Sequence, residues 1–326
     1  MKRRHACIGA LGLGLGCGHA LAQQPAKVFR IGSLSITHPE LAAFFRAALE
    51  DRLRELGWRP GIDIVFERRY AGDLSRLDGL AAELVNAKVD VIIAYADSGA
   101  QVVRRATSTI PIVAVDMTDP VGLGLAASLG RPGGNVTGVA WTSVGTQLFA
   151  KPLQYLRELH PHLSRVAALH RASPAFVSID AEARESARSI GITLECIEVP
   201  ALSELDTAFA AVKKAHAEAL LFWPSGDANA WHAAVAKRAL DERLPSASQN
   251  IWYAREGGLL GYGPPPGETF RRAAEYIDKI LRGANPGDLP IDQPTRFDLV
   301  VNRRTAAALG VVIPQSLLLR ADKVIE

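Results

Sequence analysis

Short apolar runs alternate with longer segments of helical periodicity along the first half of the chain. Segment 39–56 repeats apolar residues every three or four positions, the spacing of one helix face, and Gly57 is a typical stop. Segment 89–95 is a continuous apolar run, which is typical of a strand buried on both faces of a parallel sheet. We expect Asp97 or Ser98 to cap the helix that follows it. The predicted strands are 28–35, 62–70, 89–95, 112–115 and 136–141, and the predicted helices are 39–56, 74–86 and 98–107.

The same order of elements restarts in the second half, which indicates a duplicated domain. Residues 87–94, a helix end followed by an apolar run, correspond in character to residues 215–222. Residues 109–111 correspond to 243–245, because both place a proline just before a predicted strand. The paired segments are about 130 residues apart, far more than one solenoid repeat unit. The second-half strands are predicted at 166–170, 193–199, 219–223, 246–250 and 259–262, and the helices at 178–190, 202–216 and 229–240.

Strands that alternate with helices of this length predict an α/β fold with two similar doubly wound parallel-sheet lobes joined by a multi-crossing hinge. Lobe one is predicted at 28–142 and lobe two at 143–266. The remaining tail, 267–326, adds a C-terminal helix at 267–282, a strand at 296–301 and a short helix at 304–309. Because both lobes are already complete, we expect part of this tail to return to lobe one, so that the chain crosses the hinge three times. Small ligands bind preferentially at such domain interfaces.

Residues 1–22 are predicted to be a signal peptide and not part of the fold. A positive start at 2–4 is followed by an apolar stretch at 6–15 and by an A-x-A cleavage site that ends at Ala22. The apolar stretch is too short for a transmembrane span of roughly 20 residues. We therefore expect export and cleavage near Ala22. A twin-arginine signal and a lipidated Cys17 are the open alternatives.

The signal peptide also carries the excess of positive charge. The full chain has 37 Lys and Arg against 34 Asp and Glu, and three of the basic residues lie at 2–4. The mature chain is formally balanced, which argues against nucleic acid as a partner, because a basic patch is the usual footprint of such binding. Cys196 is the single cysteine outside 1–22, so we expect no internal disulfide and a buried, inert thiol. No second apolar segment is long enough to span a membrane, so we expect a soluble mature protein.

Candidate binding residues come mainly from the loops after the strands, because open parallel sheets bind ligands beyond the carboxyl ends of their strands. Ser98 and Gly99 stand at a predicted helix start, where free backbone N–H groups attract a carboxylate. Asp116, Asp119 and Asp227 could receive an ammonium group. An ordinary cap for Ser98, and turn roles for the aspartates, are equally open. Aromatic residues in the same loops could supply flat apolar walls. The candidate ligand-binding residues are Ser33, Ser35, Asp97, Ser98, Gly99, Asp116, Thr118, Asp119, His170, Ser173, Phe176, Trp223, Ser225, Asp227, Asn250 and Tyr253.

No motif for catalysis or for a cofactor is found in the sequence. It contains no G-x-S-x-G elbow, no H-E-x-x-H, no paired C-x-x-C and no Walker A sequence. The histidines outside the signal peptide lack metal-ligand spacing, and His216 and His232 are expected on helix surfaces. We therefore predict no metal, no cofactor and no enzyme activity. A two-lobed racemase, with Asp116 and Asp227 as its acid/base pair, is the alternative.

The tail and several loops resemble one family. Residues 293–302, 305–310 and 316–322 look like a C-terminal signature, and 119–122 and 129–138 add further matches. In these residues the chain resembles the ABC-transporter substrate-binding proteins of the tryptophan/tyrosine class, which have a type I periplasmic-binding-protein fold. The resemblance extends over nearly the whole mature chain.

This resemblance implies a soluble, monomeric receptor in the periplasm. Such a receptor captures a small carboxylate-bearing solute between its lobes, closes by hinge bending and delivers the solute to ABC permease subunits in the inner membrane. Members of this class bind aromatic amino acids, so the resemblance places a carboxylate site at Ser98 and Gly99. The lobe-two contacts that it implies are Trp223, Ser225, Asp227 and Tyr253. The alternative is a receptor that presents its ligand to a chemoreceptor or a sensor kinase.

Two loops depart from the family pattern. The lobe-one loop reads Ala96-Asp-Ser-Gly99, where a Thr/Ser-Pro-Ala-like stretch is expected. The first lobe-two loop reads His170-Arg-Ala-Ser-Pro174, where an Asn-Pro-rich stretch is usual. In this loop Arg171 could pair with a second carboxylate, which would favour a dicarboxylate or an aromatic acid.

Overall fold

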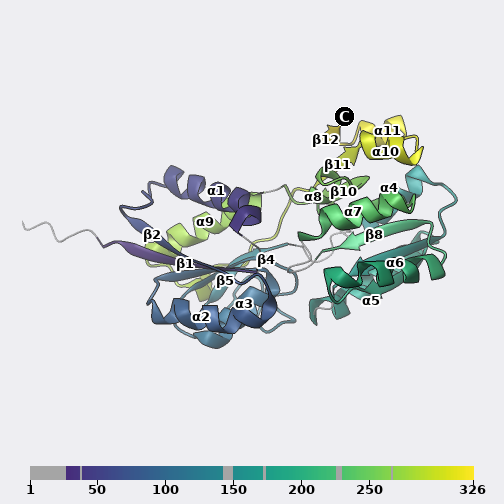
Figure 1. The fold of residues 1–326 in the computed structure, drawn as a ribbon. Coiled ribbons are helices and arrows are strands. Elements are labelled where there is room, and N and C mark those ends of the chain that lie inside the picture. The colour runs from purple at the N-terminus through teal and green to yellow at the C-terminus, as the bar shows by residue number, and fades with distance from the viewer. Residues whose placement is uncertain (1–26, 37–38, 142–149, 172–173, 225–229, 266) are drawn as a thin grey trace, which may run out of the picture.

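The computed structural model describes residues 27–36, 39–141, 150–171, 174–224, 230–265 and 267–326, without the side chains of 39–42 and 174–179 (Figure 1). Two α/β lobes lie next to each other in this structure. The predicted signal peptide lies outside the described residues. Within the described part, no helix has the length and apolar character needed to cross a membrane.

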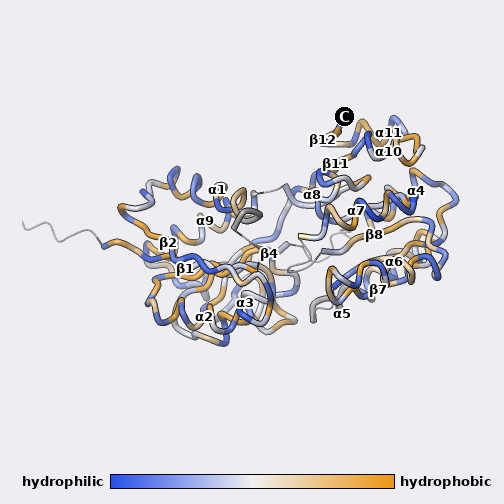
Figure 2. The backbone as a smooth tube through the Cα atoms, viewed as in Figure 1, coloured by the Kyte–Doolittle hydropathy of each residue, from blue (hydrophilic) through white to orange (hydrophobic). Residues whose placement is uncertain are grey.

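Lobe one is built on a five-stranded parallel sheet. Its strands are β1 (Phe29–Ser35), β2 (Ile64–Tyr70), β3 (Val91–Tyr95), β4 (Ile112–Met117) and β5 (Val136–Ala140), in the order β2-β1-β3-β4-β5. Its helices are α1 (Pro39–Glu55), α2 (Leu77–Asn86) with the 3₁₀ turn η1 (Leu74–Arg76), α3 (Ala96–Ala106) and α9 (Glu268–Leu281). Ile31 and Ile93 pack with α1 and α9 on one face of the sheet, and Leu34 packs with α2 and α3 on the other. Burial on both faces explains why β3 and most of β4 read as continuous apolar runs (Figure 2).

Lobe two is built on a seven-stranded sheet. Its strands are β6 (Arg165–His170), β7 (Thr193–Glu198), β8 (Ala219–Trp223), β9 (Ser246–Ser248), β10 (Leu260–Gly263), β11 (Asp298–Asn302) and β12 (Lys323–Ile325), in the order β12-β11-β10-β9-β8-β6-β7. Its helices are α4 (Ala150–Leu159), α5 (Pro174–Ser189), α6 (Leu205–Lys214) with η2 (Leu202–Glu204), α7 (His232–Asp241), α8 (Trp252–Arg255), α10 (Arg303–Leu309) and α11 (Gln315–Leu318). All of the strand pairs are parallel except β10 with β11.

The two sheets share one topology. The order β7-β6-β8-β9-β10 in lobe two repeats the order β2-β1-β3-β4-β5 in lobe one, so the repeat seen in the sequence corresponds to a repeated fold. In lobe one the second strand, β2, lies on one side of β1, and the later strands β3 to β5 lie on the other. The order therefore switches between β1 and β3, and in lobe two it switches in the same way between β6 and β8. Sheets of this kind bind ligands beyond the carboxyl ends of the strands at such a switch point.

The tail contributes to both lobes. Helix α9 packs along α1 and over β4 and β5 of lobe one, whereas β11 and β12 extend the sheet of lobe two. Segment 264–267 therefore leads from lobe two back to lobe one, and segment 289–297, which follows η4 (Pro286–Asp288), leads to lobe two again. Among the described residues, both of these segments connect the two lobes.

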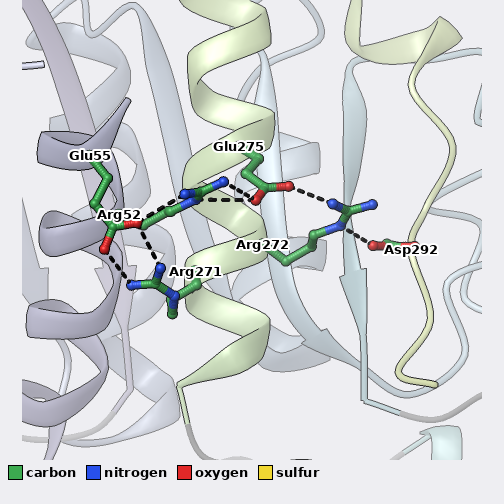
Figure 3. Close-up of polar contacts among 6 residues, drawn as sticks. All are labelled: Arg52, Glu55, Arg271, Arg272, Glu275 and Asp292. Atoms are coloured by element: carbon green, nitrogen blue, oxygen red, sulfur yellow. Dashed lines mark hydrogen bonds and ion pairs between the residues drawn. The ribbon is translucent and has the colours of Figure 1, made fainter. Parts of the chain in front are cut away.

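Ion pairs hold α1 and α9 together on the outer face of lobe one (Figure 3). Arg52 of α1 pairs with Glu275 of α9 at 2.8 Å, and Arg271 of α9 pairs with Glu55 of α1 at 2.7 Å. Hydrogen bonds from Arg271 and Arg52 lower the pKa of Glu55 to about 2. The network therefore fixes the returning helix against the first helix of the chain.

The last crossing is tied to lobe one by Asp292. Its carboxylate pairs with Arg272 of α9, and its backbone bonds to Gly138 and Ala140 of β5 (Figure 3). Gly138 has a positive φ of 141°, and a Cβ at this position would collide with the carbonyl of Ala114 on β4. A glycine is therefore required where β5 lies between β4 and the crossing segment.

Some local expectations were wrong. Helix α3 begins at Ala96 after Tyr95, so Asp97 and Ser98 lie in its first turn and neither caps it. His232 is buried, at 5% exposure, instead of lying on a helix surface. The helix α4 and the strand β12 were not predicted.

Candidate functional site

Polar residues gather at the carboxyl ends of the lobe-one strands, beside the switch point. Ser33 near the end of β1 is hydrogen-bonded to the Tyr95 hydroxyl at the end of β3. Burial raises the pKa of Tyr95 to about 12, so its phenol stays protonated. Asp116, near the end of β4, is hydrogen-bonded to Thr269 at the start of α9. The second crossing thus delivers a side chain directly to this edge of the sheet.

Asp116 combines a strained backbone with a poorly satisfied carboxyl group. Its φ is +60°, and Ala96, at the end of the neighbouring strand, has a φ of +57°. Non-glycine residues in this region are uncommon and concentrate at functional sites. Burial raises the pKa of Asp116 to about 7. Its Oδ1 atom is buried and has no hydrogen-bond partner among the described residues, and a buried polar atom of this kind calls for an explanation.

The start of α3 lies beside Asp116. Its N-cap residue, Tyr95, makes no side-chain cap, and the buried Ser98 Oγ has no hydrogen-bond partner in the described part of the chain. The first N–H groups of a helix lack intrahelical acceptors, so this terminus can bind a carboxylate. Asp97 lies close enough to Asp116 to raise its pKa. The Oδ1 atom of Asp97 accepts a 2.8 Å bond from the N–H of Thr118, which occupies one of its oxygens.

The other lobe-one candidates have structural contacts. Gly99 packs closely under β1, because a Cβ there would lie 3.7 Å from the carbonyl oxygen of Leu34. Asp119 accepts a 2.8 Å bond from the N–H of Gly122, as expected of a turn residue. Ser35 is buried at the end of β1, two residues after Ser33.

Fewer of the lobe-two candidates place polar groups at the carboxyl ends of their strands. Asn250 follows β9, and its Oδ1 accepts the N–H of Trp252 at 3.0 Å, which starts α8. His170 is buried at the end of β6, and burial lowers its pKa. Trp223 is 3% exposed and belongs to the core between the sheet and α4 and α5. Tyr253 is fully buried among Phe222 and the residues of α6 and α7, so the structure places its ring in the core.

Four candidates are not described. Ser173, Ser225 and Asp227 lie outside the described residues, and Phe176 lies in α5 with its side chain outside them. In the part of the chain that is described, no cluster of His, Cys, Asp and Glu could hold a metal ion.

Two polar residues of this region were missed in the sequence. Thr269 contacts Asp116, although it lies far along the chain at the start of a helix in the tail. Gln249 is 6% exposed beyond β9, and its Oε1 has no hydrogen-bond partner among the described residues. For Thr269 no pattern in the sequence indicated a role in this region. Gln249 could have been selected, because it stands next to the candidate Asn250 at the end of a predicted strand.

Sequence comparison connects the chain to known proteins. A model of the family described as ABC transporter substrate binding protein matches residues 33–325. A tyrosine-binding protein of Clostridioides difficile (strain R20291) is 25% identical over 284 residues, which cover 85% of this chain and 79% of that protein.

Solved structures show the same fold. An ABC domain from Streptococcus pneumoniae in complex with L-Trp is 25% identical, with 92% of this chain and 100% of that chain covered at a TM-score of 0.84. A conserved domain protein from Vibrio cholerae is 26% identical, with 91% and 100% covered at a TM-score of 0.84. The ligand-free, open structure of a substrate binding protein with adhesive properties from Clostridium difficile is 24% identical, with 91% and 99% covered, and its TM-score is 0.67.

Proposed function

Because the chain belongs to the ABC transporter substrate binding protein family, we propose that it binds a free amino acid between its lobes and delivers it to a membrane permease. The family resemblance and the two-lobed type I fold predicted from the sequence are confirmed. The family is one of solute-binding proteins and not of enzymes. Binding, without chemical change of the solute, is therefore the activity that the site must explain.

The main support is that the uncapped start of α3 and the buried carboxyl group of Asp116 lie next to each other in lobe one. The uncapped start of α3, with the buried Ser98 hydroxyl, offers donors to an anion. Asp116 offers an acceptor whose second oxygen has no partner among the described residues. An α-amino acid carries a carboxylate and an ammonium group on one carbon atom, so a single ligand would satisfy both.

Binding would also offset the energetic cost of burying the Asp116 carboxylate. A buried carboxylate without a counter-charge destabilises a protein, and it is stabilised by an opposite charge nearby. The ammonium group of the ligand would supply that charge to Asp116. The ligand would thereby lower the pKa of Asp116 below about 7.

The side chain of the amino acid is proposed to be aromatic. The relative from Clostridioides difficile is a tyrosine-binding protein, and the structure from Streptococcus pneumoniae holds L-Trp. Tyr95, which is hydrogen-bonded to Ser33 and lies near Asp116, places an aromatic ring at the same edge. The remaining candidates in the loops of both lobes are proposed as further contacts.

The location and the partners of the protein are proposed from its family. Proteins of this family are extracellular or periplasmic, and we place this one in the periplasm after cleavage near Ala22. Its proposed partners are the solute and the ABC permease subunits of the inner membrane. We propose a monomer with lobes that close by hinge bending on the solute.

A thermal-shift screen with matched analogues tests this function. L-Tyrosine and L-tryptophan at 100 times the dissociation constant should each add about 2.7 kcal/mol of stability to the mature protein. Tyramine, which lacks the carboxylate, and 3-(4-hydroxyphenyl)propionate, which lacks the ammonium group, should give little shift. Equal shifts from all three tyrosine-like compounds, or no shift from any amino acid, would contradict the proposal.

A further inference from the structure

One aromatic side chain of lobe two reaches across to lobe one. Trp252 opens α8, which lies on the side of lobe two that faces α1 (Figure 1). Its ring meets Phe44 of α1 edge-on at a centroid distance of 5.3 Å, and Phe45 of α1 at 6.2 Å. The two helices belong to different lobes, so these contacts join the lobes through side chains alone.

Each lobe holds its part of this contact firmly. In lobe two, the Oδ1 atom of Asn250 accepts the backbone N–H of Trp252, and the guanidinium of Arg255 lies 4.7 Å from the centre of the indole ring. In lobe one, Phe45 stacks on Phe270 of α9 with centroids 4.6 Å apart. Rings that are fixed on both sides lose little conformational freedom when they meet, so the contact is favourable at low entropic cost.

The same row of rings leads to the proposed ligand site. Phe270 packs on Tyr95 at 5.4 Å, and its neighbour Thr269 holds the carboxyl group of Asp116. A continuous series of packed side chains therefore connects Trp252 in lobe two with Asp116 in lobe one.

The second crossing runs directly beneath the contact. Gly267 has a φ of +84°, and a Cβ there would lie 3.1 Å from the Cβ of Ala48 and 3.3 Å from Cε1 of Phe44. The connection between the lobes thus passes against the ring that Trp252 meets.

We infer that Trp252, Phe44 and Phe45 form a closure latch, a contact made when the lobes shut that slows the escape of the solute. The inference rests on the proposed binding of a solute between the lobes, and it adds positioning residues that hold the shut state. The latch stabilises the shut state, so it lowers the rate at which the solute dissociates.

Dissociation kinetics of labelled L-tyrosine test the latch in the mature protein. Phe44→Ala and Trp252→Ala should each raise the dissociation rate roughly 2- to 12-fold, the range for an aromatic pair worth about 0.5–1.5 kcal/mol. Trp252→Phe keeps a ring and should restore most of the loss. Phe29→Ala is the matched control, because Phe29 forms a similar pair with Trp58, at 5.5 Å, entirely within lobe one. Unchanged rates in the latch variants, or an equal effect of the control, would overturn the inference.

A ligand-free measurement separates the latch from the proposed function. Spin labels on cysteines that replace the exposed Ala82 of α2 and Ala210 of α6, in a Cys196→Ser background, report the distance between lobes. We expect a closed population in the ligand-free protein that Trp252→Ala removes and the control keeps. A distance distribution without a closed population, or one that Trp252→Ala leaves unchanged, overturns the latch. Failure of every amino acid to bind would instead overturn the proposed function.

Discussion

Replacing Asp116 with asparagine is expected to stabilise the ligand-free protein and to weaken its binding of amino acids. The carboxyl group has a reference pKa of 3.8, and burial raises it to about 7 in the folded protein. Because the folded pKa is higher than the unfolded one, ionisation of Asp116 destabilises the fold. This cost is absent below about pH 4 and grows until the pH passes 7.

The magnitude follows from the difference in pKa. A difference of about three corresponds to about 4 kcal/mol, since each pKa unit corresponds to about 1.4 kcal/mol. This is an upper limit at pH 8, and the corresponding cost at pH 5 is about 2 kcal/mol. Asparagine keeps an oxygen that can accept the hydroxyl of Thr269 but carries no charge, so it should remove most of the cost.

Urea unfolding of the mature protein at pH 8 and at pH 5 measures this effect. The variant should have a higher midpoint than the wild type at both values, with the larger gain at pH 8. Asp78→Asn serves as the control, because the Asp78 side chain is 72% exposed and should respond little. A variant that is no more stable at pH 8, or a gain that increases toward acidic pH, would refute the reasoning.

Three further outcomes are expected. The affinity for L-tyrosine should fall about tenfold for each pH unit below 7, as Asp116 becomes protonated, and calorimetric titrations that give a constant affinity from pH 8 to pH 5 would contradict this. Ser98→Ala should weaken binding roughly 2- to 12-fold, the worth of one hydrogen bond, with no change in melting temperature, because Ser98 caps no helix. Gly138→Ala should destabilise the protein by about 1–3 kcal/mol in urea, because its Cβ would strike β4, whereas Gly134→Ala, which has open space, should not.

Most of the strands could be predicted because their signal is local. Segment 89–95 contains β3 (Val91–Tyr95), and the order of elements in the first half recurs in the second. Strand direction and pairing depend on distant segments instead. Strand β11 pairs antiparallel with β10, and the three-residue β12 pairs with β11. No local sequence pattern indicates either pairing.

The candidate site could be predicted only at the level of its loops. Asp116 and Ser98 were found because they follow strands in a parallel sheet, where ligands bind. Thr269 was missed, since its contact with Asp116 requires the tail to return to lobe one. Tyr253 was predicted as a ligand contact because it follows a predicted strand. Its ring instead packs into the core against Phe222, at a centroid distance of 5.8 Å.

His232 was misjudged for the same reason. A polar residue in a helix is normally exposed, but the start of α7 turns inward and brings His232 against Phe222 and Tyr253. Burial lowers its pKa to about 4, so it stays neutral at physiological pH. Burial of this kind arises from tertiary packing, which helical periodicity does not encode.

The most direct test of the central claim is a crystal structure of the mature protein grown with L-tyrosine. The account predicts one molecule between the lobes, with its ammonium group within hydrogen-bond distance of Asp116 and its carboxylate at the start of α3 beside Ser98. A ligand that leaves Asp116 without a partner, or that binds away from the facing edges of the two sheets, would contradict it.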